Sequence, residues 1–169
     1  MSELKAVIPI KILGKWHKVS AVKHPISLVR VVFTRSVIVS IPEHKPAEEK
    51  TAQLSDAKTI TGPTNKIDVV QVTGMPGLYQ ASMRTLLNQD GDPIDPYIVD
   101  MECVGIFKVD GSLDAAEAIR AVTITAHSVL YGAIREAVSW ITGRHAFGPL
   151  VLGLSILQPT PPKASTSKD

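Results

Sequence analysis

Residues 78–109 read LYQASMRTLLNQDGDPIDPYIVDMECVGIFKV, and this stretch decides the fold. Apolar and polar residues alternate in both halves, which is the pattern of strands with one buried face. Residues 88–93 between the halves have the composition of a turn, and Gly91 can adopt a positive φ there. The pattern therefore predicts a long antiparallel hairpin. Its apolar face takes Tyr79, Ala81, Met83, Thr85 and Leu87 from the first strand and Tyr97, Val99, Met101, Cys103, Phe107 and Val109 from the second.

After the hairpin the apolar period changes from two residues to about 3.6, which indicates a helix over residues 113–142. Ser112 is the expected N-cap, and Gly143 is the expected stop. A continuous helix of this length would extend for about 45 Å, which is more than a small sheet can cover. We therefore expect either a break near residues 123–125 or packing of part of the helix on another subunit.

Four further segments are predicted to be extended. Residues 8–17 alternate as one edge strand around Pro9, and residues 67–73 extend the sheet. Residues 149–157 form a short strand or an extended lip. Residues 28–41 are rich in β-branched types and apolar on both faces. One face of that strand is expected to hold Val29, Val31, Phe33, Val37, Val39 and Ile41.

The rest of the chain sets the domain organisation. Its 169 residues fit one domain, which we place at residues 1–157. Residues 42–66 are polar and contain three prolines, so they are interpreted as a mobile loop. Residues 158–169 are interpreted as a disordered Pro-rich tail. The fold class is therefore α+β, with a four-stranded antiparallel sheet and a long C-terminal helix on one face.

Composition points to a globular protein in a reducing compartment. No apolar run approaches the roughly 20 residues of a membrane span, and we expect no secretory signal and a cytoplasmic location. The single cysteine, Cys103, excludes an internal disulfide. Residues 1–50 carry nine Lys and Arg against four acids, whereas residues 88–117 carry eight acids against one Lys. Cross-strand pairing of these segments is the favoured explanation, and a nucleic-acid surface is the alternative.

We find no constellation that predicts an enzyme, a metal site or a cofactor. The histidines are scattered, and His127 is interpreted as a partly buried or interface residue. Cys103 lies on an apolar strand face and is expected to be an inert core thiol. The acids at 90, 92 and 95 lack the spacing of a calcium loop. Asp100 and Glu102 share one strand face, where a salt-bridged surface is favoured over acid–base chemistry.

The positive signal is a surplus of apolar surface. One helix covers part of one sheet face, yet strand 28–41, the lip and the Trp140 end of the helix add further apolar residues. A monomer with these elements would expose more than the few hundred Å² of contiguous apolar surface that soluble proteins usually show. Such a surface predicts an oligomer interface or a binding surface, unless loop 42–66 covers it.

The second half of the chain resembles the SecB-like chaperones, the group of the protein-export chaperone SecB. The resemblance covers about residues 97–152, and the remainder matches in strand order only. Gly132 departs from it, because the family usually has proline at that point. The motifs that carry it are Val104-Gly-Ile-Phe107, Val109-Asp-Gly111, Val129-Leu-Tyr131, Ile134-Arg-Glu136, Gly143-Arg144 and Phe147-Gly-Pro-Leu-Val-Leu152.

The resemblance implies an ATP-independent holdase that binds unfolded clients in apolar grooves and assembles as a homotetramer, a dimer of dimers. It implies a dedicated client, such as the antitoxin of a toxin–antitoxin–chaperone system, or alternatively preproteins for the translocase. The expected client-binding residues are Ile26, Leu28, Val29, Val31, Phe33, Tyr79, Met83, Trp140, Leu150 and Leu152. The expected oligomer interface comprises Ile119, Val122, Ala126 and Val129.

Asp100 and Glu102 are the candidates for docking a partner, and a pI near 8.7 disfavours a translocase motor as that partner. Two readings from other classes stay open. One is a structural or assembly subunit whose apolar surplus is purely an oligomer interface. The other is a basic sheet that binds nucleic acid, which predicts steeply salt-dependent binding. We expect no membrane association.

Overall fold

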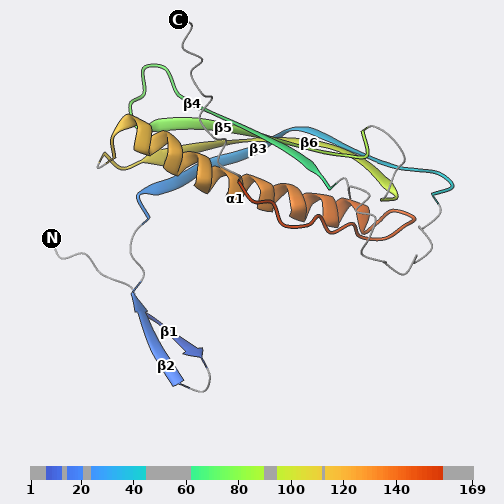
Figure 1. Cartoon of the computed structure of the whole chain (residues 1–169), viewed down its shortest axis with the longest axis horizontal. Helices are drawn as coiled ribbons and strands as arrows, with labels where there is room; N and C mark the ends of the chain where they lie inside the picture. Colours follow the sequence, from blue (N-terminus) through green and yellow to red (C-terminus); the bar gives the residue numbers. More distant parts are fainter. Residues whose placement is uncertain are drawn as a thin grey trace, which may run out of the picture.

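The computed structural model describes residues 7–12, 15–20, 24–44, 62–89, 95–111 and 113–157. Within these ranges, six strands precede one long helix (Figure 1). The elements are β1 (Val7–Ile12), β2 (Lys15–Ser20), β3 (Ile26–Ser40), β4 (Thr64–Gln71), β5 (Leu78–Leu87), β6 (Tyr97–Val109) and α1 (Ala115–Thr142).

A four-stranded antiparallel sheet has the order β3-β6-β5-β4, and α1 packs on one of its faces. The predicted hairpin is confirmed as β5 and β6, with Met83 opposite Cys103. Its turn begins at Asn88, which has a φ of 53° and donates from Nδ2 to the carbonyl oxygens of Asp95 at 2.7 Å and Tyr97 at 2.8 Å. Gly91 and the acids at 90 and 92 lie outside the described residues. The expected fourth strand is also confirmed, and β4 includes residues 64–66, which the sequence assigned to the loop.

The N-terminal segment differs from the prediction. Instead of one edge strand it forms the hairpin β1–β2, a two-stranded sheet of its own in which Ile12 is opposite Lys15. Residues 8–12 and 15–17 continue the same alternation of residue types, so the periodicity carried no signal of the reversal between them. The remainder of loop 42–66, from residue 45 to 61, and tail 158–169 lie outside the described residues.

β3 also departs from the predicted alternation. Register shifts between Leu28 and Arg30 and between Phe33 and Arg35 are β-bulges, each of which adds a residue to one side of the ladder. Each bulge reverses the parity of the residues that follow. Phe33 therefore shares the helix face with Ser36 and Ile38, which are opposite Met101 and Val99. The predicted alternation instead places Val37 on the same face as Phe33.

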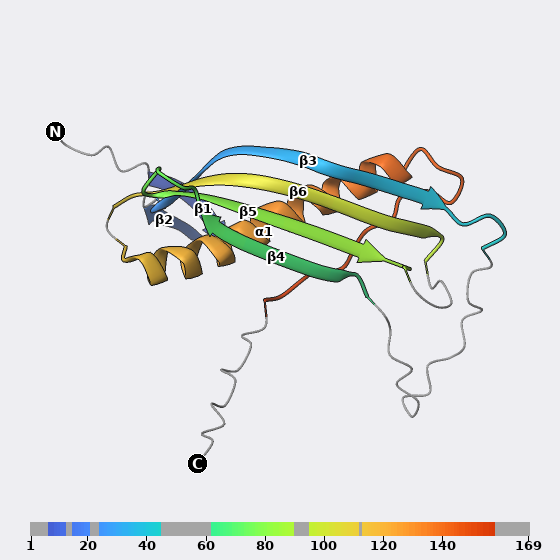
Figure 2. The same ribbon diagram turned by 90° about the horizontal axis from the view of Figure 1, so that it is seen from above.

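α1 is continuous over 28 residues, about 42 Å, so the break near residues 123–125, one of the two alternatives for this helix, does not occur. Its N-cap is Asp114 rather than Ser112, because the Asp114 carboxylate accepts a 2.8 Å hydrogen bond from the Glu117 amide. Ser112 lies outside the described residues. The helix crosses the sheet diagonally, from the β4 side at its start to the β3 side at its end (Figure 2). The crossing leaves two corners of this sheet face without a helix over them.

The core lies between β5, β6 and α1. Gly105 lets the helix approach, since a Cβ there would lie 2.6 Å from the Phe107 ring and 2.9 Å from a Leu130 methyl carbon. The other fully buried side chains include Met83, Met101 and Ile134. β3 contributes little, because most of its residues are exposed. The core is thus centred away from the β3 edge of the sheet.

Residues 149–157, which we call the strap, pass back beside α1 as an extended segment without strand pairing (Figure 1). Of the two alternatives for this segment, the extended lip is the one observed, and its leucines differ in exposure. Leu152 is buried at 3% exposure and Leu150 is half-buried, whereas Leu154 is 85% exposed. The strap therefore covers one of the two corners that the diagonal helix leaves open, next to β4.

Candidate functional site

The second corner, between β3 and α1, remains open as a groove. Its cavity volume is about 390 Å³. β3 and β6 supply its floor and one wall, and the C-terminal half of α1 supplies the other wall. The lining residues are Phe33, Ser36, Met101, Ala133, Glu136, Ala137, Trp140 and Ile141. The groove follows from the diagonal crossing and from the small side chains at 133 and 137, which occur at helical i, i+4 spacing on the flank that faces β3.

Two large aromatic side chains stand exposed at this groove. Phe33 is 42% exposed and Trp140 is 63% exposed. The Arg144 guanidinium lies 4.0 Å from the centroid of the Trp140 ring, so a cation–π contact holds the indole in place. Leu28 and Val29, earlier in β3, are exposed as well. Groups of exposed large apolar residues on a soluble chain mark interaction surfaces.

The groove runs beside an open edge of the sheet. β3 pairs with β6 on one side and with no other described strand. The outer edge of a 15-residue strand presents main-chain N–H and C=O groups to an incoming extended chain. A segment that pairs with this edge would place alternate side chains over the groove. The bulges at Val29 and Thr34 divide the edge into shorter regular stretches.

The structure separates the residues expected to bind clients into three groups. Phe33 and Trp140 lie at the groove, with Leu28, Val29 and half-buried Val31 along the same strand. Ile26, Tyr79 and Met83 are core residues with exposures of 6% or less, and none of them lines the β3–α1 groove. Leu150 and Leu152 belong to the strap, on the other flank of α1. Sequence reasoning missed Ser36, Glu136 and the small residues Ala133 and Ala137, because a helix stripe alone does not tell core alanines from groove alanines.

The residues expected at an oligomer interface divide in the same way. Val122 and Ala126 are fully buried between α1 and the sheet, whereas Ile119 is 43% exposed and Val129 is half-buried. Ile124, which the sequence did not single out, is 57% exposed. The exposed apolar surface of the first half of the helix is therefore formed by Ile119 and Ile124.

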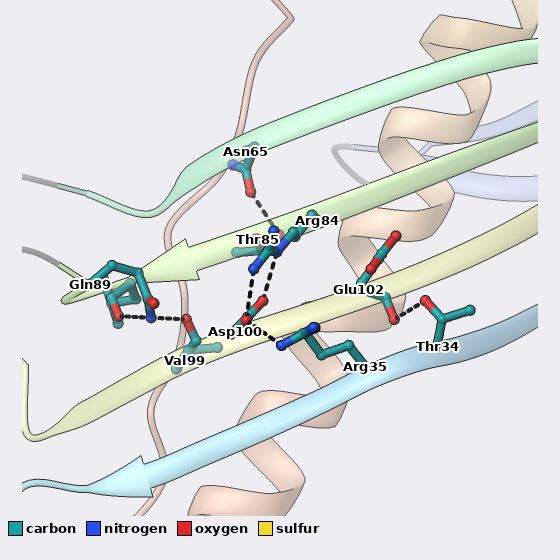
Figure 3. A network of polar contacts seen from close by, with 10 residues as sticks. Thr34, Arg35, Asn65, Arg84, Thr85, Gln89, Val99, Asp100 and Glu102 are labelled. Atoms are coloured by element: carbon teal, nitrogen blue, oxygen red, sulfur yellow. Dashed lines mark hydrogen bonds and ion pairs between the residues drawn. The ribbon is translucent and has the colours of Figure 1, made fainter.

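On the opposite face of the sheet, Asp100 is enclosed by two arginines (Figure 3). Arg84 from β5 donates to the Asp100 carboxylate from Nε and from Nη2, each at 2.8 Å. Arg35 from β3 donates to the same carboxylate from Nη1 at 3.1 Å. The Arg84 hydrogen bonds hold the pKa of Asp100 below its usual value, against the opposing effect of burial. The predicted salt bridges are confirmed for Asp100, and Arg35 with Asp100 joins the basic first part of the chain to the acidic strand.

This arrangement bears on Asp100 and Glu102 as docking residues. The Asp100 side chain is 12% exposed, and its charge is compensated by both guanidinium groups. Glu102 lies further along the same face and is half-buried. Its carbonyl oxygen accepts a 3.5 Å hydrogen bond from Thr34 Oγ1. The face as folded offers the outer edges of Arg35 and Arg84 to a partner more than it offers Asp100.

The titratable groups in the core fit structural roles. Cys103 is fully buried, its thiol lies 3.6 Å from the Leu130 carbonyl oxygen, and burial raises its pKa to about 12. Such a thiol is protonated at neutral pH and is a poor nucleophile. Within the described ranges, three His, Cys, Asp or Glu side chains nowhere gather as a metal ion would require. No helix in the described part of the chain combines the length and apolar character needed to cross a bilayer.

Fold and site together define a class: an α+β protein with an apolar groove between a helix and an open sheet edge. No family model matches the sequence, and no curated protein was found to match it. Among solved structures, the chain is similar to the Rv1957 SecB-like chaperone of Mycobacterium tuberculosis, determined in complex with a ChAD peptide from the Rv1956 HigA1 antitoxin. The two share 19% identity over 78% of this chain and 91% of that chain, with a TM-score of 0.46.

Proposed function

We propose that this protein is an ATP-independent chaperone that holds extended apolar segments of unfolded polypeptides in the groove between β3 and α1. The observation that carries the proposal is the joint exposure of Phe33 and Trp140 at an apolar groove next to an unpaired strand edge. The edge supplies main-chain hydrogen bonds to any sequence, and the groove supplies a preference for apolar side chains.

The energetics suit reversible holding. Burial of apolar surface contributes about 25 cal/mol per Å², and ordering the unfolded client opposes it. The net affinity is therefore modest for each segment and increases with the length of chain that is engaged. Release needs no nucleotide, since folding or transfer of the client removes its apolar segment from solution.

For the finer specificity we propose a dedicated client, such as an antitoxin, in preference to preproteins destined for the translocase. An acidic docking surface for a motor is implied by the resemblance to SecB, and the enclosure of Asp100 by Arg35 and Arg84 disfavours it. We also propose the dimer of dimers, in which a second copy would cover the exposed Ile119 and Ile124. Light scattering on the purified chain tests the mass of the assembly.

Aggregation of a chemically denatured client tests the holdase proposal. The purified chain at equimolar amounts should suppress light scattering without ATP. Phe33→Asp should abolish most of that suppression, since it places a charge in the groove. Val70→Asp is the matched control, because Val70 is 57% exposed and lies on β4 at the other edge of the sheet.

Two outcomes would contradict the proposal. A folded wild-type chain that leaves aggregation unchanged would favour a structural subunit, in which the apolar surface only joins copies. An equal loss of suppression in the Phe33 and Val70 variants would show that the β3–α1 groove is not the binding site. Melting curves of each variant keep a loss of fold apart from a loss of binding.

A further inference from the structure

The strap, residues 149–157, is held against α1 mainly through its main chain. Arg135 Nε donates to the Leu152 carbonyl oxygen at 2.8 Å, and the Tyr131 hydroxyl donates to the Gly153 carbonyl oxygen at 2.8 Å. At the start of the strap, the Leu150 amide donates to Thr142 Oγ1 at 2.8 Å. These contacts involve only the main-chain carbonyl and amide groups of the strap. They would therefore form with almost any side chain at these positions.

Three helix residues beside the strap form one row. His127, Tyr131 and Arg135 are spaced four apart, so they lie on one flank of α1. The His127 and Tyr131 rings are stacked with centroids 6.0 Å apart, and the Arg135 guanidinium lies 6.0 Å from the Tyr131 centroid. The row is therefore ordered by its own members as well as by the strap.

The strap lies in a channel between this row on α1 and the strand β4. Contacts from β4 close the far end of the channel. Ser155 Oγ lies 3.0 Å from His127 Nε2 and accepts a 3.0 Å hydrogen bond from Asn65 Nδ2. Asn65 is itself oriented, since its Oδ1 accepts a 2.7 Å hydrogen bond from Thr85 Oγ1. A cavity of about 330 Å³ remains beside these groups, lined also by Ile67 and Met83. The channel is thus not fully filled by the strap.

The side chains of the strap make a weaker case for permanent burial. Leu152 is the single buried residue of the strap, at 3% exposure. Val151, Leu154 and Ile156 are 68%, 85% and 83% exposed. A segment that belonged to the core would bury its large apolar residues, whereas this one lies in the channel as a bound extended peptide would.

We propose that the channel between the His127–Arg135 row and β4 is a second site for extended apolar polypeptide, with the strap as its resident and exchangeable occupant. The inference rests on the proposed holdase function, because the ligand is of the same class. A client segment would take the main-chain contacts of the strap and place one apolar side chain where Leu152 lies. The strap then lowers the apparent affinity of the channel by the fraction of time that it is seated.

A labelled synthetic nonapeptide with the sequence of residues 149–157, PLVLGLSIL, is the probe. Leu152→Asp should unseat the strap, because it places a charge at the buried anchor, and the channel should then bind the peptide. A strap seated nine-tenths of the time predicts about tenfold tighter peptide binding after its release. Leu154→Asp is the matched control, since Leu154 is solvent-exposed in the same segment and its change should leave the affinity as in the wild type.

A second substitution locates the bound peptide. In the Leu152→Asp background, Arg135→Leu should weaken peptide binding and Phe33→Asp should not. The reverse result would place the peptide in the β3–α1 groove, which overturns the exchange of the strap and leaves the holdase proposal intact. Equal affinity of the wild type and Leu152→Asp would overturn the inference as well.

A further measurement avoids a destabilising change. Ile156→Cys can be labelled selectively with a fluorophore, because the native Cys103 is fully buried. Excess unlabelled nonapeptide should lower the fluorescence anisotropy of the label as the strap leaves the channel. No change at saturating peptide would contradict an exchangeable strap, even if Leu152→Asp failed to fold.

Discussion

At the scale of single residues, Asp100 shows how a charge can be structural on an open sheet face. Its side chain is 12% exposed and accepts hydrogen bonds from arginines on both neighbouring strands. The cluster joins β3, β6 and β5 across the face opposite the helix. For β3, the Arg35–Asp100 contact adds a side-chain link to the main-chain ladder that pairs this strand with β6.

Asp100→Asn should destabilise the fold by about 1–2 kcal/mol at neutral pH, a charge-assisted hydrogen-bond value discounted for the half-exposed arginines. The folded-state pKa of Asp100 is lowered, so its contribution is present above the usual value of 3.8 and is lost as the pH falls below it. Urea denaturation should therefore show a gap between wild type and variant at pH 7 that narrows at pH 3. A constant gap would mean that the carboxylate charge is not involved.

His127 gives a pH dependence of the same direction but at higher pH, and its cause is burial rather than an ion pair. Burial lowers the pKa of its imidazole below 6.5, so the unfolded state takes up a proton at a higher pH than the folded state does. Stability should be complete above about pH 7.5 and decline as the pH falls through 6.5, by at most about 1.4 kcal/mol per unit. His127→Gln should flatten this decline in thermal melts between pH 7.5 and 5.5. An unchanged slope would assign the pH dependence to other groups.

At the scale of elements, the contact between β6 and α1 depends on the absence of a side chain. Gly105→Ala should lower stability by about 1–3 kcal/mol, because the new methyl group would overlap the Phe107 ring and Leu130. Gly132→Ala is the matched control on the exposed side of the helix, where nothing lies within 4 Å. It should raise stability by about 0.5–1 kcal/mol through helix propensity. Melting temperatures that shift in the same direction for both variants would contradict this account.

Strongly periodic elements were predictable and their relative placement was not. The β5–β6 hairpin and α1 followed from clean periods of 2 and 3.6. The face of β3 was predicted wrongly after Phe33, because a bulge shifts the register without leaving a mark in composition. The diagonal path of α1 also has no sequence signature. The sequence thus could not separate exposed from buried apolar residues. Phe33 and Trp140 lie exposed at the groove, whereas Met83, predicted as a binding residue on the same grounds, lies in the core.

At the scale of the whole molecule, the formal net charge of +2 is distributed so that opposite charges meet across strands. The candidate groove is lined by one charged residue, Glu136, among mostly apolar side chains. Client binding there should therefore depend on apolar burial, which is nearly insensitive to moderate salt. The affinity for a nucleic acid would instead fall steeply as the salt concentration rises, because binding releases cations from the phosphates.

The affinity for an unfolded client should accordingly change by less than about threefold between 50 and 500 mM NaCl, a small shift beside the 10³-fold or greater losses expected when several phosphates are contacted. Calorimetry should also give a negative heat-capacity change on binding, which reports buried apolar surface. Phe33→Asp should reduce the magnitude of that heat-capacity change, whereas Val70→Asp should leave it unaltered. A steep loss of affinity with salt and no heat-capacity change would place binding on the arginines of the opposite face, and the groove would then lose its role.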